Sequence, residues 1–294
     1  MSQGSNQMRV TWGSDELDLG AYLERTGYCG RLDPTAATMR DLHHHHVEAI
    51  PFENLDIIFG RPPVLDLASL QAKLVTRRRG GYCYEHNVLF AAVLERLGFA
   101  VTGLSARVTM GTSKPRPPTH MCLRAEAEGD SWLVDVGFGG DGMLEPIPLR
   151  QGQQVSQGVG AWQYSLAREA TGPWALRSLR PQGWLELYTF TLEPRWPIDY
   201  QVFNWYTATH PRSPFTQRPI VQKAGDSIRR SLVGGELTVV RRDWTSQTRA
   251  VAPADVPGVL AADFGIELTT HDAETLCSLA SSPSGSCPGN ARDG

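Results

Sequence analysis

The run that most strongly indicates the fold is Arg79-Gly80-Gly81-Tyr82-Cys83-Tyr84-Glu85-His86-Asn87. Behind it, apolar residues recur at helical spacing as far as Leu97, and Gly98 supplies a stop signal. Cys83 therefore falls at the expected start of a helix, where unpaired N–H groups and the helix dipole favour a thiolate. The glycine pair lets the backbone turn sharply and leaves the sulfur approachable. This setting is typical of a nucleophile, although free cysteines are also common in apolar cores.

A nucleophilic cysteine needs a base and a group that orients the base. His120 follows a proline-rich stretch and opens an apolar segment, and Asp135 lies in a segment, 131–139, that is typical of a buried strand ending in glycines. A buried carboxylate is costly unless it is paired or hydrogen-bonded. We therefore interpret Cys83, His120 and Asp135 as the catalytic residues. The alternative is that Asp135 only accepts backbone N–H groups at a strand end.

Strand geometry offers a test of the His120–Asp135 pair. A hairpin of residues 120–128 and 131–138 that turns at Gly129-Asp130 puts both side chains on one face. In that register Asp135 lies opposite Arg124, about 13 Å along the strand from His120. Direct contact would then require another register, a bulge or a strong bend.

The nine-residue run resembles the Arg-Gly-Gly-x-Cys-x-Glu-x-Asn signature of arylamine N-acetyltransferases of the actinobacterial type, a family that includes the ansamycin amide synthases. Other segments match the same family in the same order: Pro51-Phe52-Glu53-Asn54-Leu55, Thr119-His120, Asp135-Val136-Gly137-Phe138-Gly139, and Asn204-Trp205-Tyr206-Thr207 followed by His210-Pro211. The similarity extends from about Leu17 to about Leu268, which is most of the chain.

The resemblance implies an α+β fold with a papain-like Cys-His-Asp triad. Its expected parts are an N-terminal helical domain with the nucleophile (1–98), a central antiparallel β-barrel with His120 and Asp135 (99–205), and a C-terminal α/β lid (206–277). The residue patterns agree with these parts, because helical periodicity gives way to short apolar runs separated by turns, and then to a mixture of the two. Residues 278–294, rich in Ser, Gly and Pro, predict a disordered tail.

The resemblance also implies which residues meet the substrates. Acetyl-coenzyme A is the expected acyl donor, and no bound cofactor is expected. For coenzyme A the resemblance implies contacts with Thr119, Gly139 and the segment from Asn204 to His210. Because hydrolysis competes unless water is excluded, we also expect an aromatic wall around the substrate, with Phe52, Tyr84, Phe138 and Phe215 as candidates. Each aromatic residue taken alone is equally typical of plain core. Lys114 and Arg116 are candidates to meet phosphates, with a solvated loop as the alternative.

Four residues are expected to support the nucleophile without touching substrate. The resemblance suggests that Arg79 pairs with Glu53 or Asn54 in a buried bracket, and that Glu85 is part of the scaffold. Loss of one partner from a buried ion pair costs on the order of 3–5 kcal/mol, because it leaves a charge alone.

The function that the resemblance implies is ping-pong transfer of an acetyl group from acetyl-coenzyme A to an arylamine, arylhydrazine or arylhydroxylamine. Its setting would be xenobiotic metabolism or natural-product biosynthesis. An amide synthase of the same family would instead take a polyketide chain from an acyl carrier protein and close it as a macrolactam. A thiol hydrolase and a catalytically silent binding protein are the remaining alternatives.

Composition narrows the class of protein. The 294 residues allow two or three domains, and a formal charge of −3 offers no electrostatic case for nucleic acid or an anionic membrane. No apolar stretch approaches the roughly 18 residues of a membrane helix, and the N-terminus lacks a signal-peptide pattern. The five cysteines form neither a zinc pattern nor a disulfide framework, so we expect a cytoplasmic enzyme with a free thiol.

The run His43-His44-His45-His46 invites a metal-site interpretation. It lies within a helical pattern, and adjacent positions on a helix do not share a face. We therefore expect no metal ion there, and we expect His46 to pack near the corner formed by Pro51 and Phe52.

Overall fold

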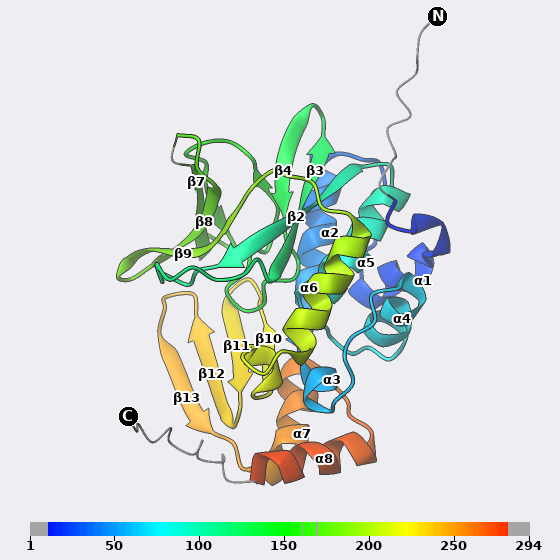
Figure 1. Cartoon of the computed structure of the whole chain (residues 1–294), viewed down its shortest axis with the longest axis vertical. Helices are drawn as coiled ribbons and strands as arrows, with labels where there is room; N and C mark the ends of the chain where they lie inside the picture. The colour runs from blue at the N-terminus through cyan, green and yellow to red at the C-terminus, as the bar shows by residue number, and fades with distance from the viewer. Residues whose placement is uncertain (1–10, 161, 169, 282–294) are drawn as a thin grey trace, which may run out of the picture.

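The computed structural model describes residues 11–160, 162–168 and 170–281 (Figure 1). It has three groups of elements: N-terminal helices, an eight-stranded antiparallel sheet that closes nearly into a barrel, and a five-stranded sheet with C-terminal helices. Among the described residues, none of the helices is long and apolar enough to cross a membrane.

The N-terminal part is helical, as the periodicity predicts. Its elements are a 3₁₀ turn (Ser14–Glu16), α1 (Leu19–Thr26), α2 (Ala36–Ala49), α3 (Leu55–Ile58), α4 (Leu67–Leu70) with a π-helical continuation (Gln71–Thr76), and α5 (Cys83–Arg96). Helix α1 begins where the Asp18 side chain accepts a hydrogen bond from Ala21 N, and it ends at Gly27, whose φ is 69°. All residues of α5 from Cys83 to Leu94 are buried, so this helix forms the centre of the molecule.

The barrel follows α5 in the chain. Its strands are β2 (Ala100–Val108), β3 (His120–Ala127), β4 (Asp130–Val134), β5 (Ile147–Pro148), β6 (Gln154–Gln157), β7 (Trp162–Arg168), β8 (Trp174–Arg180) and β9 (Gly183–Phe190). They are arranged in the order β5-β4-β3-β2-β9-β8-β7-β6, with every pair antiparallel. One face of β3 packs on α5 through Met121 and Leu123, and Cys122 faces the barrel core.

The β3–β4 hairpin forms, but its predicted turn is wrong by one residue. Ala127 pairs with Asp130, so the turn is Glu128-Gly129, with φ of 53° and 85°. Positive φ at both positions is the geometry of tight hairpins whose twist matches the strands. The unusual φ of Glu128 is supported from outside the hairpin, because its carboxylate accepts a hydrogen bond from Ala36 N at the start of α2 (3.1 Å).

The second sheet joins distant parts of the chain. Its order is β1 (Phe52–Glu53), β10 (Ile220–Lys223), β11 (Ile228–Val233), β12 (Glu236–Arg241) and β13 (Ser246–Ala250). The remaining elements are α6 (Pro197–Thr209), 3₁₀ turns at Pro214–Thr216 and Pro253–Asp255, α7 (Val256–Val259) with a π-helical end (Leu260–Phe264), and α8 (Thr270–Ser281). Figure 1 shows this sheet below the barrel, with α6 above it to the right and α7 and α8 at its lower end.

Two details bear on the predicted domain boundaries, which stay a proposal. Strand β1 belongs to the N-terminal third of the chain, yet Phe52 pairs with Gln222 of β10, so the second sheet includes a strand from outside 206–277. Helix α8 continues through 278–281, the first residues of the predicted disordered tail, and the rest of that tail lies outside the described residues.

Candidate active site

Cys83 is the first residue of α5, at the floor of a large cavity, and only 3% of it is exposed. Glu85 caps the helix by accepting a hydrogen bond from Tyr82 N (3.0 Å). The glycine pair acts differently from the predicted sharp turn, because neither Gly80 nor Gly81 has a positive φ. A Cβ at Gly80 would lie 2.0 Å from the carbonyl oxygen of Pro51, so glycine is needed there for close packing.

His120 and Asp135 are in direct contact. Their Nε2 and Oδ2 atoms lie 2.7 Å apart, and both side chains are buried. The observed register explains the contact, since continuing the Leu123–Val134 pairing sets Asp135 opposite Cys122, two residues from His120 instead of four. The prediction that His120 and Asp135 share a face of the hairpin was right. The predicted separation along the strand was wrong, because it was too long by two residues.

Electrostatics makes this contact an ion pair. Burial alone lowers the pKa of His120, but the Asp135 carboxylate, together with a hydrogen bond to the Cys83 side chain, raises it to about 10. Burial tends to raise the pKa of Asp135, and the opposing effect of His120, Asn87 and the Gly137 N–H leaves it below its usual value. An imidazolium and a carboxylate are therefore paired at neutral pH.

Asn87 and Gly137 hold Asp135 against α5. The Asn87 amide donates to Asp135 Oδ1 (3.0 Å) and to Met121 O (2.8 Å), and it accepts from Val136 N (3.2 Å). A Cβ at Gly137 would lie 2.8 Å from Cys83 Cα, so glycine allows the chain after β4 to approach the nucleophile. No role was predicted for Asn87, although its position four residues after Cys83 puts both on one face of a helix.

His43 also positions Asp135. Its Nδ1 donates to Leu144 O (2.9 Å), so its Nε2 must be the acceptor for the Asp135 N–H (3.4 Å). Burial lowers the pKa of His43 to about 4, which keeps the ring neutral at physiological pH, and its two hydrogen bonds select the tautomer.

A row of hydrogen-bonded side chains that includes two histidines lies behind the turn that carries Cys83. His86 Nε2 donates to Pro51 O (3.2 Å), His46 Nε2 donates to His86 Nδ1 (2.9 Å), and the Tyr22 hydroxyl donates to His46 Nδ1 (2.9 Å). Burial lowers the pKa of both histidines, that of His86 to about 4. His46 thus reaches the predicted corner at Pro51 through the ring of His86.

The cavity above Cys83 has a volume of about 770 Å³. The predicted contact residues Phe52, Thr119, Phe138 and Phe215 line it, together with Cys83 and His120. Two predicted residues do not line it. Tyr84 is fully buried and packs on Tyr82 and Tyr200. Gly139 lines a separate small pocket beside Phe52 and Phe138, and a Cβ there would meet the Gln222 side chain at 2.2 Å.

Aromatic rings enclose the imidazole of His120. Phe138 meets it edge-on with ring centroids 5.2 Å apart, and Tyr188 of β9 lies at 5.1 Å. Tyr188 was missed in the sequence, where it is one of several aromatic residues in an alternating strand. Packing of this kind keeps water away from the ring and fixes its orientation.

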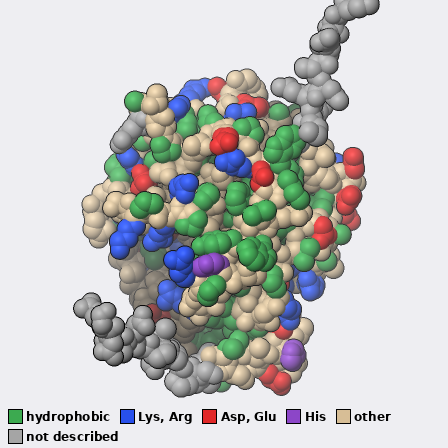
Figure 2. Space-filling model, viewed as in Figure 1, with side chains coloured by type: hydrophobic (Ala, Val, Ile, Leu, Met, Phe, Trp, Pro, Cys, Tyr) green, Lys and Arg blue, Asp and Glu red, His purple; other side chains and the backbone are tan. Residues whose placement is uncertain are grey.

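Two arginine side chains contribute to the lining of the cavity. Arg116 and Arg212 line it, whereas Lys114, the other predicted phosphate contact, does not. Figure 2 shows Lys and Arg side chains gathered left of centre, where the barrel meets the second sheet. An anionic group of a ligand would find favourable charge there.

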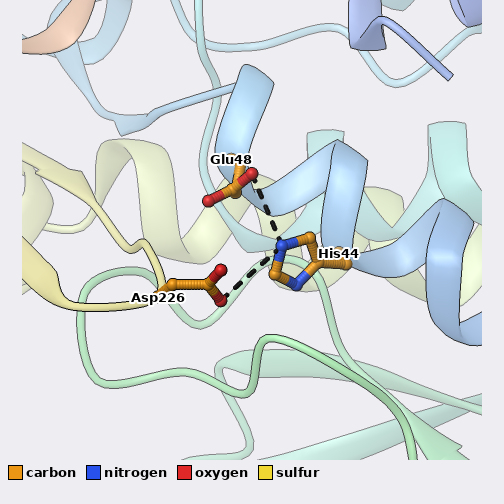
Figure 3. Close-up of side chains that lie close together, drawn as sticks. All are labelled: His44, Glu48 and Asp226. Carbon is orange, nitrogen blue, oxygen red and sulfur yellow. Dashed lines mark ion pairs between the residues drawn. The ribbon is translucent and has the colours of Figure 1, made fainter. Parts of the chain in front are cut away.

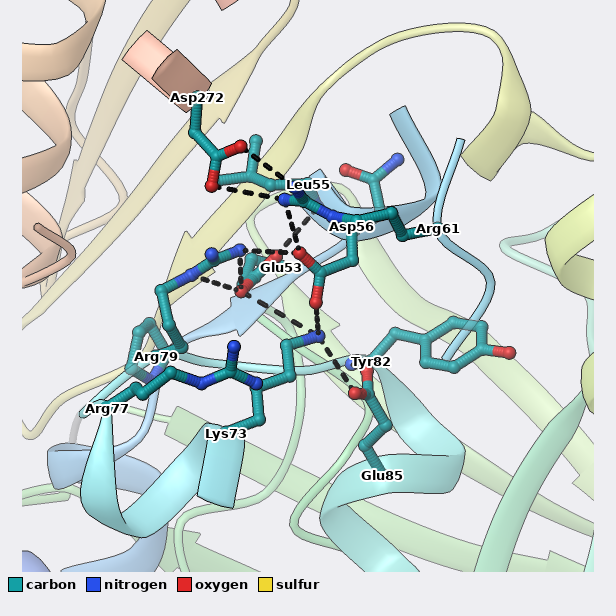
Figure 4. A network of polar contacts seen from close by, with 12 residues as sticks. Glu53, Leu55, Asp56, Arg61, Lys73, Arg77, Arg79, Tyr82, Glu85 and Asp272 are labelled. Carbon is teal, nitrogen blue, oxygen red and sulfur yellow. Dashed lines mark hydrogen bonds and ion pairs between the residues drawn. The ribbon is translucent and has the colours of Figure 1, made fainter. Parts of the chain in front are cut away.

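Buried charges brace the nucleophile turn (Figure 4). Arg79 donates to Glu53 Oε1 from both Nε (3.0 Å) and Nη2 (2.7 Å), so of the two predicted partners it pairs with Glu53. Asn54 instead donates to the carbonyl oxygens of Phe215 (2.8 Å) and Arg218 (2.9 Å), which ties the turn after β1 to the segment before β10.

Lys73 extends this network to the cap of α5. Its Nζ lies 2.8 Å from Glu85 Oε1 and 3.0 Å from Asp56 Oδ2. Asp56 also binds Arg61, whose guanidinium donates to both carboxylate oxygens of Asp272 in α8. Sequence reasoning missed Lys73, Asp56, Arg61 and Asp272, because no local pattern distinguishes them from solvated charges.

Comparison with known proteins agrees with this geometry. An N-acetyltransferase family model matches residues 35–273. An arylamine N-acetyltransferase of Mycolicibacterium smegmatis is 42% identical over 261 residues, which cover 86% of this chain and 93% of that protein. The chain belongs to the arylamine N-acetyltransferase family. It is accordingly an acyltransferase.

Solved arylamine N-acetyltransferases share the fold. The Nocardia farcinica structure is 45% identical, covers 92% of this chain and 97% of its own, and has a TM-score of 0.87. The Mycobacterium marinum arylamine N-acetyltransferase in complex with CoA is 35% identical, covers 90% of this chain and 99% of its own, and has a TM-score of 0.83. The predicted α+β fold with its antiparallel barrel is therefore confirmed.

Proposed function

We propose that this protein transfers an acetyl group from acetyl-coenzyme A to arylamines, arylhydrazines or arylhydroxylamines through a thioester on Cys83. The observation that carries the proposal is that Cys83 and His120 line one 770 Å³ cavity, with His120 held from behind by its ion pair with the buried Asp135. The family of the chain and the CoA complex of its M. marinum relative support the choice of donor.

In the first half-reaction the Cys83 thiolate attacks the thioester carbonyl carbon of acetyl-coenzyme A. The new S–C bond forms as the bond from that carbon to the coenzyme A sulfur breaks. The departing thiolate takes a proton from the imidazolium of His120, which is charged at neutral pH because its pKa is raised to about 10. Free coenzyme A leaves, and acetylated Cys83 remains beside a neutral His120.

In the second half-reaction the amine nitrogen attacks the acetyl carbon on Cys83. His120 takes the proton that the nitrogen loses, and Cys83 departs as a thiolate. The amide is released, and the paired thiolate and imidazolium are restored. Asp135 keeps the imidazole oriented through both steps and stabilises its charged form.

The walls of the cavity suit these substrates. Phe52, Phe138 and Phe215 offer aromatic surface to an arylamine and limit the access of water to the acetylated cysteine. Arg116 and Arg212 offer positive charge to the phosphates of coenzyme A. Because the reaction needs a reduced thiol, we propose the cytoplasm as its compartment.

Intact-protein mass spectrometry tests the proposal most directly. Incubation with acetyl-coenzyme A should add one acetyl group, and a simple arylamine should remove it. Cys83→Ala should abolish the gain. Cys122→Ala is the matched control, because Cys122 is also a buried cysteine yet packs in the barrel core, and it should leave the gain intact.

A ping-pong mechanism makes a second prediction, which concerns the release of coenzyme A. Coenzyme A should be released in a burst of one equivalent before any amine is added. No acetylation by acetyl-coenzyme A, with loading instead from an acyl carrier protein, would favour the amide synthase alternative. Acetylation that persists in Cys83→Ala would remove the basis of both.

A further inference from the structure

The four consecutive histidines of α2 make different contacts. His43 positions Asp135, His46 continues the buried chain to His86, and His45 Nδ1 contacts Thr26 O (3.2 Å). His44 points a different way, toward Glu48 one turn later and Asp226 in the turn between β10 and β11 (Figure 3).

These three side chains form a compact set of donors. His44 Nε2 lies 3.4 Å from Glu48 Oε2 and 3.7 Å from Asp226 Oδ1. One donor atom from each of the three residues can be chosen so that all lie within 4.8 Å of one another. Distances of 3.4 and 3.7 Å are long for a hydrogen bond between an imidazole and a carboxylate.

The same distances fit ligands of a shared metal ion. Nitrogen and oxygen ligands lie about 2.0–2.2 Å from zinc, and in a tetrahedral site this places them roughly 3.3–3.6 Å from each other. All three donor atoms lie within 4.8 Å of one another, so rotation of the partly exposed carboxylates toward each other by about 1 Å would complete three of the four positions. The fourth remains open to water, because the side chains of His44, Glu48 and Asp226 are 23%, 45% and 42% exposed.

The surrounding structure holds the donors in place. His44 and Glu48 stand four residues apart on one helix and therefore share a face. Gly225, beside Asp226, is anchored by its carbonyl oxygen, which accepts a hydrogen bond from Trp162 Nε1 (2.9 Å).

We propose that His44, Glu48 and Asp226 bind a divalent transition-metal ion of the zinc type, which would join α2 to the β10–β11 turn. From the sequence we expected no metal ion at the four consecutive histidines, because adjacent positions on a helix do not share a face. The partners of His44 are instead one turn along the helix and 182 positions along the chain. Imidazole with carboxylates suits zinc, cobalt or nickel better than magnesium or calcium.

The ion acts in structure and takes no part in acetyl transfer. Asp226 stands next to the strand pair β10–β11, and β10 carries Gln222 and Ile220 of the cavity wall. Binding to the folded protein alone would raise the thermal midpoint as the ion concentration rises above its dissociation constant.

The test uses the full chain without a polyhistidine tag, treated with chelator and carrying Cys83→Ser so that the active-site thiol cannot bind zinc. Thermal unfolding is followed during titration with ZnCl₂, with MgCl₂ as the comparison ion, and calorimetry measures the stoichiometry. At a hundredfold excess over the dissociation constant, zinc should raise the midpoint by about 5 °C or more. Magnesium should not.

Variants assign the shift to these residues. His44→Gln and Asp226→Asn should each remove most of the zinc-dependent shift, whereas the matched His45→Gln should retain it. Both mutated side chains are partly exposed, so the variants should remain folded without zinc. The proposal would be overturned if zinc does not raise the thermal midpoint of the Cys83→Ser protein. It would also be overturned if adding His44→Gln to that protein leaves the zinc-dependent rise unchanged.

Discussion

Replacing Lys73 by methionine should destabilise the protein strongly, because Lys73 is a buried cation among three carboxylates. Only 5% of it is exposed, and its Nζ lies 2.8, 3.0 and 4.0 Å from Glu85, Asp56 and Glu53. Burial tends to lower the pKa of Lys73, but these carboxylates raise it above its usual value. Methionine fills a similar volume and removes only the charge and its hydrogen bond.

The expected loss of stability depends on which partners each of the three carboxylates keeps when Lys73 is replaced. Glu53 and Asp56 keep Arg79, whose Nη2 lies 2.7 and 3.5 Å from them. Glu85 keeps only the hydrogen bond from Tyr82 N among its contacts in the described part of the chain. One uncompensated buried carboxylate corresponds to the lower end of the range for broken buried pairs, about 3 kcal/mol.

Urea unfolding followed by circular dichroism measures this change in the free energy of unfolding. The destabilisation should shrink as pH falls, because a proton on Glu85 relieves the uncompensated charge. The double variant Lys73→Met with Glu85→Gln should recover most of the loss. Lys114→Met, at an exposed lysine, is the control and should change stability by less than about 0.5 kcal/mol. A Lys73→Met cost below 1 kcal/mol, or one independent of pH, would refute the reasoning.

Three further predictions follow from the site. Asp135→Asn should slow acetylation of Cys83 by about 10³-fold or more in stopped-flow assays while the protein stays folded, because His120 loses its orienting charge; a loss below tenfold would contradict this. Gly137→Ala should cost about 1–3 kcal/mol in urea unfolding and reduce activity, because its Cβ would lie 2.8 Å from Cys83 Cα; an unchanged urea midpoint would argue against the close approach. Acid should destabilise the protein as pH falls from about 6.5 to about 4, since burial lowers the pKa of His43 and His86 to about 4 and the unfolded chain binds protons first. Thermal midpoints that stay constant over that interval would show that these histidines are not held neutral.

Much of the fold could be predicted because its signals are local. Gly27 and Gly98 mark helix ends, and α5 begins at the predicted cysteine. The alternation in β3 and β4 predicts a hairpin with His120 and Asp135 on one face, and the structure has it. Asn87 could have been added to the site by the same helix spacing, since it follows Cys83 by one turn.

Other features depend on contacts between distant segments. The hairpin turns at Glu128 and Gly129, and the start of α2 binds the Glu128 carboxylate there, a contact that no signal within the hairpin reveals. Tyr84 was expected at the cavity and Tyr188 was not. Helix α5 is buried on all sides, so its periodicity does not tell which face meets the cavity. Lys73 and Asp272 look like solvated charges until the fold buries the network between them.

The sequence by itself determined the elements, the family and the candidate nucleophile Cys83 at the start of α5. Residues within one helical turn or one hairpin are held near each other by chain connectivity, so their spacing carries this information. Only the tertiary structure decided the register that joins Asp135 to His120, the partner of Arg79, and the cluster of His44, Glu48 and Asp226. Those contacts depend on how separate elements pack, and packing depends on the shape and charge of the whole chain.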